Sequence, residues 1–240
     1  MKDGFIKVAA GTPDVQVADC EFNASEIIKM VHEMEAEGAK VMVFPELCIT
    51  AYTCGDLFWQ ENLLEEAKKQ LFRIAEETKD VEALIFVGLP LEYKGKLYNV
   101  AAGLNHGEVL GFVPKIHIPN YNEFYEARYF TSGENVDGTV TVRTEDYGFC
   151  HMDELDDNDD VEFDLEAEIE ALEEAEFEEL EEVEDDPDYI DEDEEELMEQ
   201  DIPISSNVLF TCPDMPKLRI AAEICEDLWV LNPPSVAHAY

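Results

Sequence analysis

Leu218 to Val230 read LRIAAEICEDLWV, a mostly apolar run that leads to a cysteine and then turns sharply polar. Its first residues favour a strand, and acids flank Cys225: Glu223 lies two positions before it, and Glu226 and Asp227 follow directly. The pattern predicts a strand that presents a thiol at the rim of a buried sheet.

Two earlier stretches end in the same way. VMVFPE carries Glu46 to the end of an apolar run, and VLGFVPK does the same for Lys115. In α/β folds, ligands bind outside the carboxyl ends of the strands. A carboxylate, an amine and a thiol at three strand ends are therefore candidates for one active site.

The charge of the chain is extreme and unevenly spread. Its 240 residues are enough for one large domain with a real core, yet the formal net charge is -44. The segment Asp153 to Asp201 holds 30 of the 59 acids and no Lys or Arg, and removing those acids from -44 leaves -14. We expect this acidic segment to be a disordered insertion between strands of an ordinary acidic protein.

The composition excludes several classes of function. Such a negative charge repels phosphates, so we expect neither nucleic acid nor a membrane as a partner. No apolar run approaches the ~18 residues that cross a bilayer, and the first residues do not resemble a signal peptide. The six cysteines form no CxxC pair and the five histidines lack metal-ligand spacing, which predicts a cytoplasmic protein with reduced thiols and no metal site.

Hydrophobic periodicity predicts strands that alternate with helices, as in an α/β fold. Asn23, with Glu26 three positions later, is the predicted start of the first helix because this spacing is typical of a capping box. Pro90 is predicted to close the third strand. The predicted strands are 5–10, 41–44, 83–89, 139–142 and 207–211; the predicted helices are 23–38 and 61–78; a hairpin is predicted over 96–115 and a long functional loop over 116–130.

The three strand-end residues have complementary chemistry. Glu46 can act as a general base, and Lys115 can stabilise the oxyanion that forms when a thiol attacks a carbonyl, together with the backbone N–H after Cys225. Each residue alone has a simpler interpretation: a cysteine is more often an inert buried side chain, at roughly four chances in five, and a Glu or Lys after proline is more often a solvated loop residue.

Three stretches, in this order, resemble the signatures of the nitrilase or carbon-nitrogen hydrolase superfamily: FPELCITAYTCGDLF, PKIHIPNYNEFYEARYF and ICEDLWV. Their long forms are similar to the N-terminal glutaminase domains of the glutamine-dependent NAD synthetase family. The resemblance covers nearly the whole chain apart from the acidic segment. It implies an αββα sandwich, divided here into 1–152, the insertion at 153–201 and 202–240.

The resemblance also implies roles for single residues. Glu46 would be the general base, Lys115 the transition-state stabiliser and Cys225 the nucleophile that releases ammonia from glutamine. The glutamine pocket would be lined by Tyr52, Tyr121, Phe124 and Glu226.

The family pattern extends beyond Tyr240, and this predicts a sandwich truncated at its C-terminus. It implies a separate synthetase domain, which uses ATP and Mg to amidate deamido-NAD, and a homo-oligomeric full-length protein; the chain itself would carry no cofactor. Two alternatives stay open: another nitrilase-type amidase, and a non-catalytic acidic interaction protein on the same scaffold. Whether the 240 residues are active alone is also open.

Overall fold

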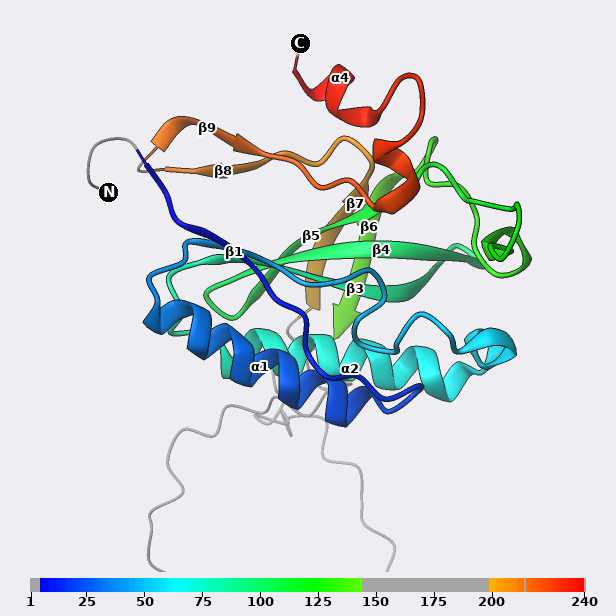
Figure 1. The fold of residues 1–240 in the computed structure, drawn as a ribbon, viewed down its shortest axis with the longest axis horizontal. Coiled ribbons are helices and arrows are strands. Elements are labelled where there is room, and N and C mark those ends of the chain that lie inside the picture. The colour runs from blue at the N-terminus through cyan, green and yellow to red at the C-terminus, as the bar shows by residue number, and fades with distance from the viewer. Residues whose placement is uncertain (1–4, 144–198, 214, 240) are drawn as a thin grey trace, which may run out of the picture.

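The computed structural model describes residues 5–143, 199–213 and 215–239. They form a mixed α/β fold, in which a seven-stranded sheet carries two long helices on one face and a two-stranded sheet on the other (Figure 1). Three of the four layers of the expected αββα sandwich are present in these residues.

The large sheet places the predicted strand ends at one edge. Its order is β1-β2-β3-β4-β5-β7-β6, with β1, β2 and β3 parallel, β4 antiparallel to both β3 and β5, and β7 parallel to β5 and antiparallel to β6. Strands β2 and β5 therefore run in the same direction, and their carboxyl ends deliver Glu46 and Lys115 to the same edge. The strands are β1 Val8–Ala10, β2 Val41–Val43, β3 Leu84–Tyr93, β4 Lys96–Asn105, β5 Glu108–Pro114, β6 Asp137–Arg143 and β7 Glu199–Ser205.

Helices α1 (Cys20–Ala36) and α2 (Glu61–Glu77) cover one face of this sheet. The predicted start of α1 at Asn23 is wrong, because Asp19 caps the helix and accepts a hydrogen bond from the backbone N–H of Phe22. Asn23 lies one turn inside and is fully buried. Its side chain donates to the backbone carbonyls of Gln16 and Ile49, so it ties the helix to the loop after β2 rather than capping it.

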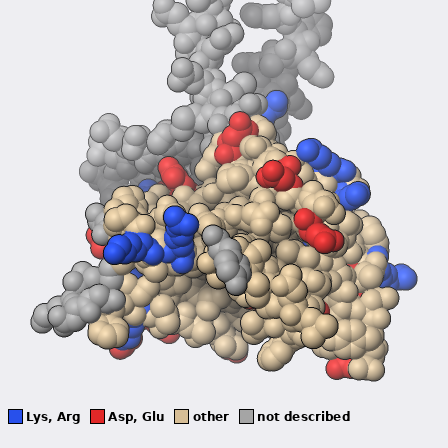
Figure 2. Space-filling view, turned by 90° about the horizontal axis from the view of Figure 1, so that it is seen from above, with Lys and Arg blue, Asp and Glu red and all other residues tan. Residues whose placement is uncertain are grey.

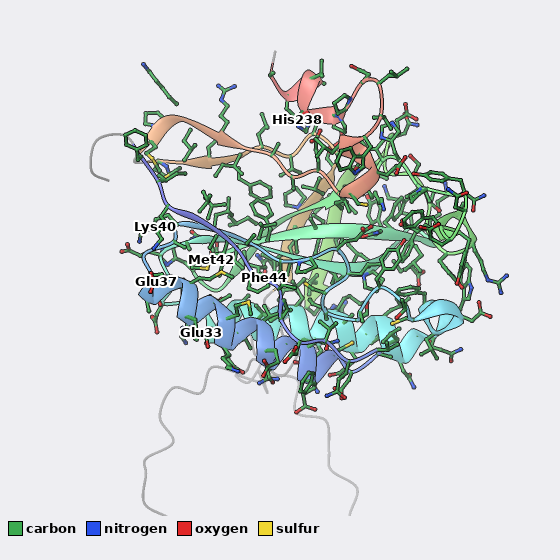
Figure 3. The ribbon with its side chains drawn as sticks, in the orientation of Figure 1. Glu33, Glu37, Lys40, Met42, Phe44 and His238 are labelled. Atoms are coloured by element: carbon green, nitrogen blue, oxygen red, sulfur yellow. The ribbon has the colours of Figure 1, made fainter. Side chains whose placement is uncertain are left out.

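The main core lies between the helices and the sheet. Figure 3 shows Met42 and Phe44, from β2 and the residue after it, on the sheet side of α1, and both are buried. Glu33 and Glu37 of the same helical region are exposed. Ile27, Ile28 and Val31 of α1 are buried and recur at helical spacing, so this helix has separate apolar and charged faces.

A second, smaller core lies on the opposite face, under the sheet formed by β8 (Phe210–Cys212) and β9 (Met215–Ile220). The ring of Phe210 meets the ring of Phe86 edge-on, with 5.0 Å between centroids. Gly103 of β4 makes room for it, since a Cβ there would lie 2.4 Å from the Phe210 ring. Figure 2 looks onto this side, where residues other than Lys, Arg, Asp and Glu cover most of the surface.

Strand β3 continues through Pro90, which was predicted to close it. Pro90 pairs with Asn99 of β4, whereas the pairing with β2 ends earlier, at Phe86. A proline in a strand is tolerated where its missing N–H would face no partner strand. This arrangement lets β3 run past the end of β2.

The strand expected to end at Cys225 is shorter than predicted. Strand β9 stops at Ile220, and Cys225 opens a short 3₁₀-helix, η5 (Cys225–Leu228). Two further 3₁₀-helices, η1 (Gly55–Trp59) and η2 (Glu126–Arg128), lie in the loops near Glu46 and Lys115, and α4 (Pro234–His238) begins directly after Pro233.

The acidic insertion falls between β6 and β7, as expected. Strand β7 already begins at Glu199, so the last three residues assigned to the insertion from the sequence are part of the sheet. The disorder predicted for the rest of the segment lies outside the described residues.

Candidate active site

Lys115 is the centre of the site. It follows directly after β5, its backbone N–H donates to the carbonyl of Asn99 at 2.8 Å, and the residue is fully buried. Its Nζ atom donates to Oε1 of Glu46 at 2.6 Å and to both carboxylate oxygens of Glu126 at 2.9 Å. One ammonium group therefore bridges two carboxylates.

These carboxylates keep Lys115 charged. Burial by itself would lower the pKa of the amine, because a charge in a poorly hydrated place is costly. Glu46 and Glu126 outweigh this effect and raise the pKa of Lys115 above its ordinary value. At neutral pH the site therefore contains a positive charge that can stabilise an oxyanion.

Glu46 lies in the loop that follows β2. This loop packs directly against Gly88 of β3, where a Cβ would lie 2.4 Å from the backbone nitrogen of Leu47 and 2.9 Å from the carbonyl oxygen of Pro45. The glycine is therefore required for the loop to approach the sheet. Asn99 of β4 completes the contact by donating to Oε1 of Glu46 at 2.6 Å.

Cys225 reaches the same region from the other side of the large sheet. A cavity of about 300 Å³ is lined by Glu46, Asn99 and Cys225, among others. Partial burial and the negative charge of Glu46 raise the pKa of the Cys225 thiol, and Lys115 opposes this rise. The thiol is therefore protonated at neutral pH and needs a base in order to react.

Three other cysteines fit the simpler interpretation of a cysteine, which is that of an inert buried side chain. Cys20, Cys48 and Cys54 are buried, and burial raises the pKa of Cys48 to about 12. Cys225 is exposed as a residue, and its thiol is only partly buried, close to charged side chains. The expectation of an inert, buried thiol therefore fits those three residues and does not fit Cys225.

The four residues predicted to line the glutamine pocket form two pairs near Glu126 and Cys225. The Tyr52 hydroxyl donates to Oε1 of Glu126 at 2.6 Å, and Tyr52 and Phe124 both line a second cavity of about 270 Å³. The Tyr121 hydroxyl donates to Oε2 of Glu226, directly after the cysteine, at 2.8 Å. The rings of Tyr121 and Phe124 meet edge-on, with 5.8 Å between centroids, and this contact links the two pairs.

Three polar residues without a role predicted from the sequence also lie at the site: Asn99, Glu126 and Asp227. All three are buried. Asn99 was detectable as the one amide within the apolar run LYNVAAGL, and Glu126 as an acid among the aromatic residues of the long loop. Asp227 gave no distinct signal, because it stands among other acids.

The described residues contain no group of three or more His, Cys, Asp or Glu side chains arranged to hold a metal ion. None of the helices in this part of the chain is long and apolar enough to span a membrane.

Comparison with known proteins relates this geometry to a family. The carbon-nitrogen hydrolase family matches residues 7–152. The glutamine-dependent NAD(+) synthetase of Mycobacterium tuberculosis is 28% identical over 236 residues, which cover 98% of this chain and 27% of that protein. The enzyme of the same name from Aquifex aeolicus is 39% identical over 118 residues, which cover 49% of this chain and 20% of its own length.

Among solved structures, the glutamine-dependent NAD(+) synthetase of Cytophaga hutchinsonii superposes with a TM-score of 0.62 at 23% identity. The superposition covers 92% of this chain and 28% of that one, and it shows a shared fold. The chain spans about a quarter of the length of these relatives. Because the family match extends over more than half of its residues, the chain belongs to the carbon-nitrogen hydrolase family.

Proposed function

We propose that this chain is the glutamine-hydrolysing part of a glutamine-dependent NAD synthetase. The observation that carries the proposal is the convergence of Glu46 and Cys225 on one cavity, with the Lys115 ammonium bonded to Glu46. A base, a nucleophile and a fixed positive charge are the groups that cleavage of an amide through a thioester needs.

The first half of the reaction forms the thioester. Glu46 takes the proton of the Cys225 thiol while sulfur attacks the side-chain carbonyl carbon of glutamine. Lys115 and the backbone N–H of Glu226 stabilise the negative charge that develops on the carbonyl oxygen. Glu46 then returns the proton to nitrogen, the C–N bond breaks, and ammonia leaves a γ-glutamyl thioester on Cys225.

The second half restores the enzyme. Glu46 removes a proton from a water molecule that attacks the thioester carbonyl, and the same positive charge stabilises the second tetrahedral intermediate. The C–S bond breaks, the thiol regains its proton, and glutamate is released. In both halves the basic oxygen of Glu46 would be Oε2, because Lys115 and Asn99 both donate to Oε1.

The four residues around the triad fit the substrate in chemical character. Tyr52, Tyr121 and Phe124 would contact the aliphatic part of glutamine with their rings, and the carboxylate of Glu226 suits its α-ammonium group. Tyr121 and Phe124 are already in ring contact.

The ammonia would be used by a synthetase domain that amidates deamido-NAD with ATP and Mg. The support is the name shared by the relatives and the length that they have beyond the matched part. We further propose a cytoplasmic homo-oligomer as the complete protein.

The test is to incubate the full-length protein with glutamine and, separately, with an electrophilic ketone analogue of glutamine. We expect ammonia release in the first case and a covalent adduct on Cys225 in the second. Cys225→Ala should lose both while it still uses free ammonia for NAD synthesis. Release of ammonia from other small amides but not from glutamine would identify a different amidase, and a folded protein without either reaction would refute the proposal.

A further inference from the structure

Asp227 holds together two segments of the site that lie more than one hundred residues apart in the chain. Its side chain is 3% exposed. Oδ1 accepts from the backbone N–H groups of Ile116 at 3.2 Å and His117 at 2.7 Å, and it lies 3.0 Å from Nδ1 of His117. Oδ2 accepts from Ile116 and from the backbone N–H of Ile224, both at 3.3 Å.

The backbone groups that donate to Asp227 lie next to two of the proposed catalytic residues in the chain. Ile116 and His117 directly follow Lys115, and Ile224 directly precedes Cys225. One buried carboxylate therefore fixes the main chain beside the stabilising amine and the main chain beside the nucleophile. The two segments come from different layers, since Lys115 follows the large sheet and Cys225 follows the small one.

The backbone of Cys225 needs such support. Its φ is +46°, in the left-handed region that a residue with a Cβ rarely adopts. A conformation of this kind costs about 1–3 kcal/mol and persists only where the surroundings hold it. The bond from Ile224 N–H to Asp227 closes the turn around Cys225 and keeps the strained residue in place.

We propose that Asp227 is a positioning residue, which sets the place of the Cys225 thiol relative to Lys115 and Glu46 without touching the substrate. The catalytic part of this inference rests on the proposed glutaminase function. The structural part, that the thiol leaves its place when the carboxylate is lost, can be tested without turnover.

The first experiment is the variant Asp227→Asn in the full-length protein. The amide oxygen can keep the contacts of Oδ1 with the loop after Lys115, whereas the amide NH₂ cannot accept from Ile224. We expect kcat for glutamine to fall about tenfold, as the loss of one buried hydrogen bond would produce, with KM within about twofold of wild type. Asp201→Asn is the matched control, because Asp201 also accepts a hydrogen bond, from Thr141, but lies in β7.

The second experiment measures the rate of Cys225 alkylation by iodoacetamide against pH, in wild type, Asp227→Asn and Asp227→Ala. A thiol released from the turn becomes less buried and moves away from Glu46, so the apparent pKa should fall toward that of a free cysteine in both variants. If the variants fold with an unchanged thiol pKa and an unchanged kcat, the positioning role is wrong. If wild type hydrolyses no amide, the glutaminase proposal fails, and the alkylation profile still decides the role of Asp227.

Discussion

Asn99 donates a hydrogen bond from Nδ2 to Oε1 of Glu46 at 2.6 Å, and this orientation of the amide leaves its oxygen without a partner in the described part of the chain. Its other side-chain atom, Oδ1, is buried and has no hydrogen-bond partner among the described residues. A buried acceptor without a partner costs about 1–3 kcal/mol. The amide cannot be reversed to satisfy it, because Oδ1 would then face a carboxylate oxygen. The site thus tolerates an unpaired oxygen in order to fix Glu46.

Replacing Asn99 should therefore separate activity from stability. We expect Asn99→Ala to lower kcat about tenfold with little change in KM, since Glu46 loses one of the two donors that orient it. The melting temperature should change little, because the unpaired oxygen is removed together with the hydrogen bond. Asn105→Ala is the control: Asn105 lies in the same strand and donates to a backbone carbonyl away from the site. Equal losses of activity in the two variants would contradict the role of Asn99.

Glu46→Gln should lower the pKa of the Cys225 thiol. The carboxylate of Glu46 is one of the causes that raise this pKa, whereas Lys115 opposes the rise and stays in place beside Glu126. The variant should lose amide hydrolysis, because the base is gone, yet form thiolate at a lower pH than wild type. Thiolate absorbance followed against pH measures this. A thiol pKa that rises or stays constant would show that Glu46 does not act on Cys225 in the resting protein.

The sequence predicted the strand-end positions of Glu46 and Lys115 correctly, and their catalytic roles stay predictions. Glu46 and Lys115 follow parallel strands, β2 and β5, and the apolar runs before them are visible without a structure. Cys225 was predicted at a strand end, but four residues of irregular chain separate it from β9. A strand and an irregular approach to a turn have similar local composition, so the pattern could not distinguish them.

Contacts between distant segments could not be predicted from local patterns. Glu126 meets Lys115 only because the loop after β5 folds back, and Asn99 meets Glu46 only because β4 lies beside β3. The positive φ of Cys225 likewise lies in a turn closed by the hydrogen bond from the Ile224 N–H to Asp227, and the local pattern does not reveal either feature. The strongest local signals belong to Glu46, Lys115 and Cys225, the residues for which the resemblance implies a catalytic role. The sequence did not predict that Asn99, Glu126 and Asp227 hold these residues in position.

Lys115→Met should destabilise the fold. It leaves the carboxylates of Glu46 and Glu126 near each other without their shared cation, and breaking a buried ion pair in this way costs about 3–5 kcal/mol. The double variant Lys115→Met/Glu126→Gln removes one of the two charges and should regain part of that loss. Urea unfolding at neutral pH measures both. A double variant no more stable than the single one would contradict the account.

The stability that Lys115 provides should also depend on pH. Its pKa is raised in the folded state above the ordinary value of about 10.4, so the folded protein binds the proton more tightly than the unfolded chain. The contribution is therefore fully present below about pH 10 and is lost as pH rises through the folded pKa. The melting temperatures of wild type and Lys115→Met, each plotted against pH, should approach each other at alkaline pH. Curves that stay parallel from neutral pH upward would contradict the expected linkage.

Removing residues 144–198 should leave the sheet and the site intact. Strands β6 and β7 pair antiparallel, and their registered ends are Arg143 and Glu199, so the chain leaves the sheet and returns to it at neighbouring positions. An Asn-Gly turn can join such strands as a tight hairpin. The shortened protein loses 30 acids, yet we expect its melting temperature to stay within a few degrees of wild type, because β6 and β7 keep their pairing. Alkylation of Cys225 should keep its pH profile, and loss of cooperative unfolding would show that the segment is required for the fold.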